Sequence, residues 1–210
     1  MISIIHPLVR KVEQEYSILH SLVDDLPFLY DKMAREIDEL AKADAEDAAN
    51  GDDDIYRSVY NAYLETIGSI YEVPNQSRGY LLAAIYAFYE RNVQCVFKEL
   101  GVIHYEKESV TTHNVFDICG LSIGDHQELY TGIDSLGLIR NNLSHGRLNK
   151  KEHWDRLNEY VVNNGHLEMN DDVVFIKDDE YLFQSLDIIM AFFETVFASN
   201  SAFTRTVISS

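Results

Sequence analysis

Apolar residues recur along most of the chain at the three-to-four-residue spacing of an amphipathic α-helix, not at the alternating spacing of a strand. The longest run extends over 7–49, where Pro27 is expected to kink or split the helix. A second run over 55–71 is expected to end before Pro74. Further helices are predicted at about 77–101, 125–145, 151–162 and 179–199. The pattern therefore predicts a chain built mainly of helices.

One segment near the C-terminus departs from the helical period. Residues 167–169 and 173–176 carry mostly apolar side chains, and Asn170-Asp171-Asp172 between them is typical of a turn. This segment, about 166–177, predicts a β-hairpin, whereas 102–124 predicts a loop with short irregular pieces. The expected fold class is all-α, or mainly α: a helical bundle with a small β-hairpin insertion.

The whole chain, 1–210, is expected to form a single domain, because 210 residues suffice for one core. Residues 1–75 would form an N-terminal helical extension and residues 76–210 the core. The N-terminus lacks the basic start of a secretion signal. The apolar run 182–198 is interrupted by two acids, which indicates a core helix instead of a membrane span. We therefore expect a cytoplasmic protein without membrane contact, whose two cysteines stay free.

The chain is strongly acidic, with 35 acidic against 17 basic residues and a formal net charge of −18. Such a charge disfavours nucleic-acid binding over the whole surface, because like charges repel phosphate, but it does not exclude a focused site. Nine acids and one lysine gather between Glu36 and Asp54. We interpret this run as a solvated helix end and an acidic loop; a contact with a basic partner is the alternative.

A basic island in this acidic chain lies at residues 139–151, which hold four basic residues and no acid. The four are Arg140, Arg147, Lys150 and Lys151. Within the island, Arg140 and His145 stand five positions apart, with two asparagines and Ser144 between them, at the predicted end of a helix. Local positive charge of this kind favours an anion-binding site.

Helical geometry separates the arginine from the histidine. At 100° per residue, Arg140 falls on the buried face of its helix, in the sector of Leu129 and Ile133. His145 lies about 140° further round, and Asn141 shares the face of His145. A guanidinium that faces a core needs a carboxylate, a cleft or a partner subunit. Two interpretations follow: a buried salt bridge beside an ordinary helix end, or an anion site that a second helix or subunit completes.

The preceding predicted helix offers two polar side chains near its apolar face. Asn92 falls within that face and Glu90 lies on its border. Either they form structural hydrogen bonds, or they line a cleft and hold another residue in place. Three scattered histidines, His104, His113 and His126, lack the spacing of metal ligands, so neither a metal nor another cofactor is expected.

The string Ile139-Arg140-Asn141-Asn142-Leu143-Ser144-His145-Gly146 resembles the signature of the HEPN superfamily (higher eukaryotes and prokaryotes nucleotide-binding domains). That signature is an arginine, four to six residues and a histidine, and a polar residue often follows the arginine, as Asn141 does here. The segment 84–92, an apolar-aromatic run that ends near an acid, is also similar. The resemblance covers residues 77–146 and implies a HEPN-like helical bundle. The long connection between its two helices and the β-hairpin depart from the family.

This resemblance implies a metal-independent endoribonuclease that acts as a homodimer, with the two motifs meeting in one cleft. Such proteins occur in toxin–antitoxin and phage-defence systems, where an antitoxin is a further partner. Other members are inactive modules that bind a nucleotide, RNA or a protein. The implied catalytic residues are Arg140, His145 and Asn141, supported by Glu90, Asn92 and Ser144, with Arg147, Lys150 and Lys151 contacting RNA.

The residue types of the motif suit RNA cleavage, in which the 2′-hydroxyl attacks the adjacent phosphate. A histidine can move the proton of that hydroxyl or protonate the leaving oxygen. An arginine can stabilise the charge of the phosphorane through paired N–H donors. Asn141 would hold the phosphate or orient His145. None of these steps needs a metal.

Overall fold

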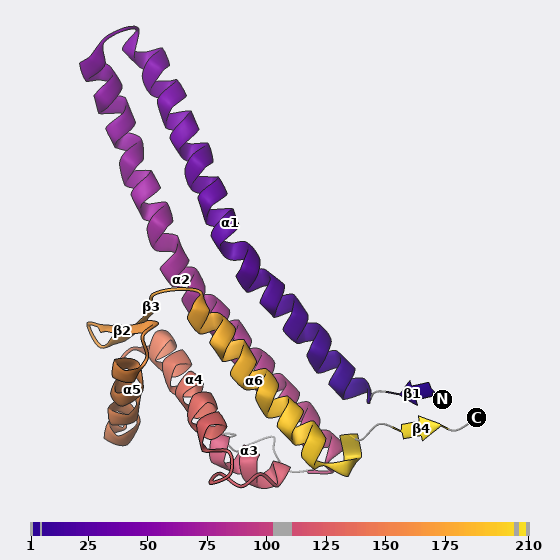
Figure 1. Ribbon diagram of the computed structural model, residues 1–210. Coiled ribbons are helices and arrows are strands. Elements are labelled where there is room, and N and C mark those ends of the chain that lie inside the picture. Colours follow the sequence, from indigo (N-terminus) through magenta and orange to yellow (C-terminus); the bar gives the residue numbers. More distant parts are fainter. Residues whose placement is uncertain (1, 5, 103–110, 204–205, 209–210) are drawn as a thin grey trace.

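The computed structural model describes residues 2–4, 6–102, 111–203 and 206–208. As predicted, the described chain is mainly helical; a long helical hairpin carries a smaller group of helices at its base (Figure 1). The hairpin consists of α1 (Pro7–Ala49) and α2 (Asp53–Glu99), which run antiparallel and are joined by a short turn. We call its outer part, residues 18–75, the arm.

α1 has the predicted range 7–49 and is not split at Pro27, whereas the predicted helix end before Pro74 is wrong. α1 continues through Pro27, and α2 continues through Pro74, so that it joins the two helices predicted at 55–71 and 77–101. A proline inside a helix removes one hydrogen bond and costs about 3 kcal/mol. The two helices lie side by side along the arm, and the packing gained over so many turns outweighs this local cost.

The acidic run forms the tip of the arm, as the first interpretation of the sequence expects. The Asp52 carboxylate accepts hydrogen bonds from the backbone N–H groups of Asp54 (2.9 Å) and Ile55 (3.2 Å), and so caps the start of α2. Asn50 and Gly51 adopt positive φ (44° and 90°), which ends α1 and turns the chain. Acids at the start of α2 also interact favourably with its dipole.

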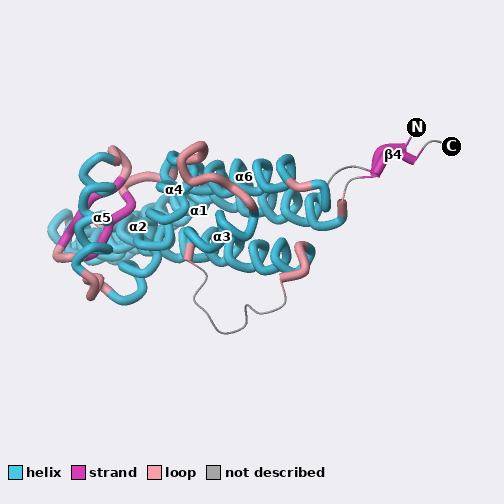
Figure 2. Tube along the Cα trace, turned by 90° about the horizontal axis from the view of Figure 1, so that it is seen from below, coloured by secondary structure: helices cyan, strands magenta, loops and turns pink. Residues whose placement is uncertain are grey.

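Three further helices cover the inner half of α2 (Figure 2). They are α3 (Thr112–Cys119), α4 (Gln127–His145) and α6 (Glu180–Ser199). The loop predicted over 102–124 is wrong in its second half, because α3 lies there and packs against α2 and α4. The Thr111 hydroxyl caps α3 by accepting a hydrogen bond from the Asn114 N–H at 3.3 Å. An eight-residue helix spans too few turns to show a helical period.

Aromatic side chains fill the core between these helices. Phe88 from α2, Phe116 from α3, and Phe192 and Phe193 from α6 are each at most 1 % exposed. Their rings meet at centroid distances of 5.3–5.9 Å, as between Phe88 and Phe193 and between Phe192 and Phe193, which is typical of favourable aromatic pairs. Among the described helices, α6 alone is long and apolar enough to cross a bilayer.

The predicted β-hairpin is present. β2 (Leu167–Asn170) and β3 (Val173–Ile176) pair in antiparallel orientation. Asp171 and Asp172 between them both adopt positive φ (47° and 65°), as a two-residue type I′ turn requires. The helix that precedes the hairpin, α5 (Lys151–Asn163), packs against α4 and β2. The hairpin and α5 therefore lie beside the C-terminal end of α4 (Figure 1).

The two ends of the described chain meet at the end of the bundle opposite the arm (Figure 1). β1 (Ile2–Ile4) pairs in antiparallel orientation with β4 (Thr206–Ile208), and a 3-10 turn, η1 (Ser201–Phe203), precedes β4. The sequence analysis does not predict these strands, since three residues are too few to show an alternating pattern.

Candidate functional site

The basic island lies at the C-terminal end of α4, where α4 faces α2. The two helices approach closely at glycines: a Cβ atom on Gly137 would lie 2.7 Å from Oη of Tyr86, and one on Gly79 would lie 3.9 Å from Leu143. The absence of a side chain on Gly137 makes room for the Tyr86 ring between the helices. This ring lies beneath Arg140, whose guanidinium carbon is 5.7 Å from the ring centroid.

Arg140 is held by three contacts at the edge of α4. Its Nη1 donates a hydrogen bond to Oδ1 of Asn141 at 2.9 Å, and its Nη2 lies 3.6 Å from Oε2 of Glu90. The third contact is the cation–π contact with Tyr86. The Arg140 and Glu90 side chains are 35 % and 44 % exposed, so this long ion pair is loose and open to solvent. An anion can therefore reach the guanidinium.

The expectation that Arg140 lies within the buried face needs correction. Ile139 and Leu136 are at most 1 % exposed, whereas Arg140 lies at the border of that face, turned toward α2. The Glu90 carboxylate and the Tyr86 ring of α2 lie beside this position and can accept a guanidinium. Ser144 and His145 are exposed, and His145 lies about 140° round the helix from Arg140.

Tyr86 is a site residue that the sequence analysis does not single out. Burial raises the pKa of Tyr86 to about 12; the nearby Glu90 carboxylate raises it as well, and Arg140 lowers it. The phenol is therefore neutral at physiological pH and serves as a hydrogen-bond donor or a stacking surface, not as a base. The spacing in the sequence could have indicated this residue, because Tyr86 precedes Glu90 by four residues and so shares its helix face.

Asn142, the second asparagine of the motif, is fully buried and fastens α4 to the β-hairpin. Its Nδ2 donates hydrogen bonds to the carbonyl oxygens of Gly146 (3.0 Å) and Asp172 (2.9 Å), and its Oδ1 accepts one from the Val174 N–H at 2.7 Å. The middle of the motif is thus structural. Its spacing of three residues from the buried Ile139 is the signal that separates it from Asn141.

The basic flank of the motif is exposed and partly neutralised. Nη1 of Arg147 lies 3.5 Å from Oδ2 of Asp172, and its guanidinium carbon lies 5.2 Å from the Trp154 ring centroid. Lys150 and Lys151, at the start of α5, are both exposed. Beside the hairpin, these side chains form a solvent-facing cationic surface next to His145.

Asn92 is not brought to the motif. It is buried against α1, where its Nδ2 donates to Oε2 of Glu15 (2.7 Å) and to the carbonyl oxygen of Phe88 (3.0 Å). Arg91 also donates to Glu15, at 3.0 Å. Burial raises the pKa of Glu15, but the hydrogen bonds from Asn92 and Arg91 outweigh it and hold the pKa below its ordinary value. Asn92 therefore fastens α1 to α2, which is the structural alternative left open by the sequence.

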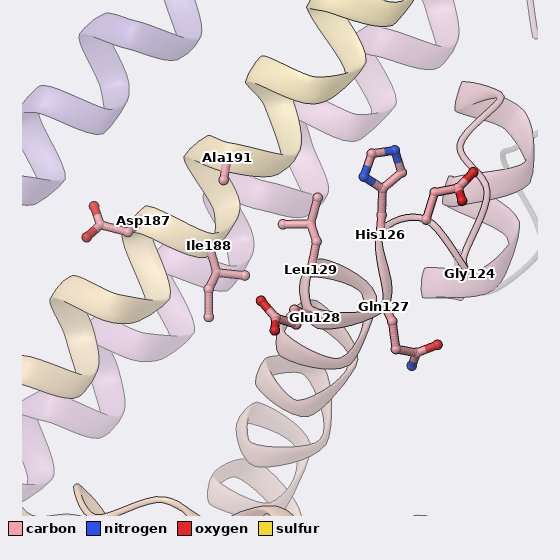
Figure 3. Close-up of a pocket in the computed structure, with 9 residues that line it drawn as sticks. Gly124, His126, Gln127, Glu128, Leu129, Asp187, Ile188 and Ala191 are labelled. Carbon is pink, nitrogen blue, oxygen red and sulfur yellow. The ribbon is translucent and has the colours of Figure 1, made fainter.

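A pocket of about 780 Å³ lies at the opposite end of α4, between its first turn and α6 (Figure 3). Its polar lining is acidic, with Asp125, Glu128 and Asp187 alongside His126. Asp187 points away from His126 and accepts a hydrogen bond from Tyr16 at 2.8 Å. The described residues contain no cluster of three or more metal-ligating side chains. This pocket is separated from the Arg140–His145 motif by the length of α4.

The motif combines an accessible guanidinium, a neutral phenol and an amide where α4 faces α2, and an exposed imidazole about 140° further round α4. Arg140 and Asn141 supply N–H donors for a phosphate, and His145 supplies an exposed imidazole with two ring nitrogens. Glu90 fixes the guanidinium from α2. These are the parts of an anion site with acid–base capacity, spread around the end of one helix.

Comparisons with known proteins do not assign the chain to a family. No protein-family model matches the chain, and neither a curated protein nor a solved structure matches it. The HEPN resemblance, which covers residues 77–146, therefore stays a prediction from the sequence, and the function has to be argued from the residues that form the site.

Proposed function

We propose that the protein is a metal-independent endoribonuclease of the HEPN type. The observation that supports this most is the accessible Arg140 guanidinium, which contacts Tyr86 and Glu90 of α2 and Asn141 of α4. The exposed His145 lies on the same helix as Arg140. The imidazole would take the proton of the attacking 2′-hydroxyl or protonate the leaving 5′-oxygen, while Arg140 stabilises the phosphorane. The resemblance suggests a toxin or a phage-defence effector as the biological role.

A second subunit would complete the site. Because Arg140 and His145 project about 140° apart on α4, one phosphate cannot easily contact both within one chain. Two copies of α4 related by a two-fold axis would place Arg140 beside the partner subunit's His145, and the reverse. Lys150 and Lys151 would then extend the cationic surface along the bound RNA.

The test is an RNA-cleavage assay in the presence of excess EDTA. Arg140→Ala and His145→Ala should each lower the cleavage rate by about 100-fold or more. The first removes the charge that stabilises the phosphorane, and the second removes the group that transfers a proton. His113→Ala and Arg35→Ala, which replace exposed residues outside the motif, are the matched controls and should cleave like the wild type. Circular dichroism would verify the fold of each variant. Equal cleavage by the wild type and both motif variants would contradict the proposal.

Complementation tests the composite site. Neither Arg140→Ala nor His145→Ala should cleave alone, but a mixture refolded together should regain part of the activity. A mixed dimer holds one site with both wild-type side chains if the two come from different subunits. No recovery, in a mixture shown to exchange subunits, would mean that each chain carries its own complete site.

The second candidate is a binding module without catalysis. The contact between Arg140 and Glu90 within one chain favours it, since a phosphate must compete with that carboxylate, and so does the net charge of −18. Here RNA or a nucleotide would bind without cleavage, and Glu90→Gln would strengthen binding by releasing the guanidinium. An equilibrium binding measurement beside the cleavage assay separates the two functions.

A further inference from the structure

Along the arm, α1 presents two apolar faces of opposite character. The face turned toward α2 is made mainly of small side chains: Ala34, Ala41 and Ala45 are at most 4 % exposed, and Val23 is the larger side chain buried with them. The other face is made of large ones, which we call the stripe. Its members are Ile18, Leu22, Leu29, Met33 and Leu40, each 48–62 % exposed. A hairpin that needed only its own packing would bury the leucines and expose the alanines.

The stripe is regular enough to receive another helix. Its members follow one another at intervals of four, seven, four and seven residues, an eleven-residue repeat that stays on one side of a nearly straight helix. At 100° per residue they fall within a sector of about 60°, and at 1.5 Å per residue the stripe is about 33 Å long. Of the eleven large hydrophobic side chains described as exposed, eight lie on the arm.

A groove of about 290 Å³ between α1 and α2 adjoins the inner end of the stripe. Ile18 and Leu19 line it from α1, and Ala84, Ala87, Phe88 and Arg91 line it from α2. The two alanines permit the backbone of another helix to approach closely. Glu15 also lines the groove, where its carboxylate is paired with Arg91 at 3.0 Å.

The charge of the arm identifies the kind of partner. Residues 18–64 contain twelve acids and four basic residues. Asp25 and Glu36 fall on or beside the face of the stripe, and so does Lys32, which pairs with Glu36 at 3.8 Å. A second copy of the arm would bring like charges together, and anionic lipid headgroups would be repelled for the same reason. A helix with lysine or arginine beside its apolar side chains would meet complementary charge.

We propose that the stripe docks an amphipathic helix of a protein partner, with basic residues flanking the apolar face of that helix. The partner would lie along α1 over about six turns, bury the stripe, and enter the groove at Ile18. This inference does not rest on the ribonuclease proposal. The stripe lies on α1, whereas the Arg140–His145 motif lies on α4.

The test uses the full chain and a fluorescent 24-residue synthetic helix. The peptide carries leucines at alternating intervals of four and seven residues, lysine and arginine on both flanks, and alanine or glutamine elsewhere. The double variant Leu22→Ser/Leu29→Ser should weaken its binding by at least about 30-fold, because two half-exposed leucines lose their apolar contacts. Val162→Ser, on α5 and 84 % exposed, is the matched control and should bind as the wild type does.

Two further measurements test the role of charge. A peptide with the same leucines but glutamate on its flanks should bind at least about 10-fold more weakly. The variant Asp25→Lys/Glu36→Lys should weaken binding of the basic peptide and strengthen binding of the acidic one. All these positions are exposed, so the variants should fold, which circular dichroism would verify.

Several results would overturn the inference. Equal binding of the peptide to the wild type and to Leu22→Ser/Leu29→Ser would show attraction by net charge alone, and no binding at about 100 μM would show that the stripe takes no such helix. Self-association of the wild type that Leu22→Ser/Leu29→Ser abolishes, seen by sedimentation, would assign the stripe to a second copy. Stripe-dependent binding to phosphatidylcholine vesicles, without peptide binding, would assign it to a membrane surface.

Discussion

The two halves of the long hairpin share one geometry but differ in what they bury. In the inner half, α2 packs large side chains such as Phe88 and Leu82, at most 1 % exposed, against α6. In the arm, Ala34 and Ala41 of α1 face α2, while Leu29 and its neighbours in the stripe remain about half exposed. Two antiparallel helices can therefore form either a core or a weakly packed projection, depending on which side chains they turn inward.

The arm is held partly by polar contacts between its helices. Tyr60 donates a hydrogen bond to Asp38 at 2.7 Å, and Tyr63 donates one to Asp44. Partly buried or exposed hydrogen bonds of this kind contribute little beside the burial of a large apolar side chain. The arm should therefore open locally at lower free energy than the core, which suits a surface that awaits a partner.

The largest expected effect is a loss of stability in the core that a similar truncation in the arm does not cause. Phe193→Ala in the core should lower the free energy of unfolding by about 3–5 kcal/mol, because it leaves a cavity among packed aromatic rings. Leu29→Ala in the arm should change it by less than about 0.5 kcal/mol. Urea denaturation measures both, and amide exchange should be faster in the arm than in α6. A large loss from Leu29→Ala would mean that the arm is part of the core.

A change of intermediate size tests the close approach of α4 to α2. Gly137→Ala should lower the free energy of unfolding by about 1–3 kcal/mol, because the new Cβ would lie 2.7 Å from Oη of Tyr86. Tyr86→Phe removes that oxygen, so Gly137→Ala should cost much less in a Tyr86→Phe background. A double-mutant cycle by thermal denaturation measures the difference. Equal costs in the two backgrounds would contradict this account of Gly137.

The smallest effect concerns the junction of the arm with the core. The pKa of Glu15 is held below its ordinary value of about 4.5, so its ionised form stabilises the fold above that pH, and this contribution is lost as the pH falls below it. Glu15→Gln should therefore destabilise the protein by less than about 1 kcal/mol at pH 7. The difference from the wild type should vanish below the folded pKa, in urea denaturation at several pH values. A difference that does not shrink as the pH falls below 4.5 would show that charge is not its cause.

Much of the fold could be predicted from the hydrophobic period and from the residues typical of turns. The helices at 151–163 and 180–199 and the β-hairpin were predicted nearly to the residue, because each carries a full period or a turn with defined dihedral angles. Pro74 misled the prediction, since the cost of a proline inside a helix is local while the packing that offsets it comes from a second helix.

The candidate site was accessible in part. The sequence isolates Arg140, His145 and the basic flank as a charge anomaly, and it offers a salt bridge of Arg140 as one alternative, for which the structure supplies Glu90. It does not say that Asn92 would turn to Glu15 on α1, because that choice depends on which helix lies opposite. Nor does it reveal the Tyr86 ring beneath the guanidinium, since only the close approach at Gly137 places it there.

The sequence by itself determined most of the helical segments, the turn of the β-hairpin and the place where basic residues gather, because these follow from local spacing and charge. Only the tertiary structure decided which apolar face each helix buries. α1 carries a small and a large apolar face, and a helical period cannot choose between them. The outcome is set by the backbone distance to α2, which favours alanines within the arm and leaves the leucines outside.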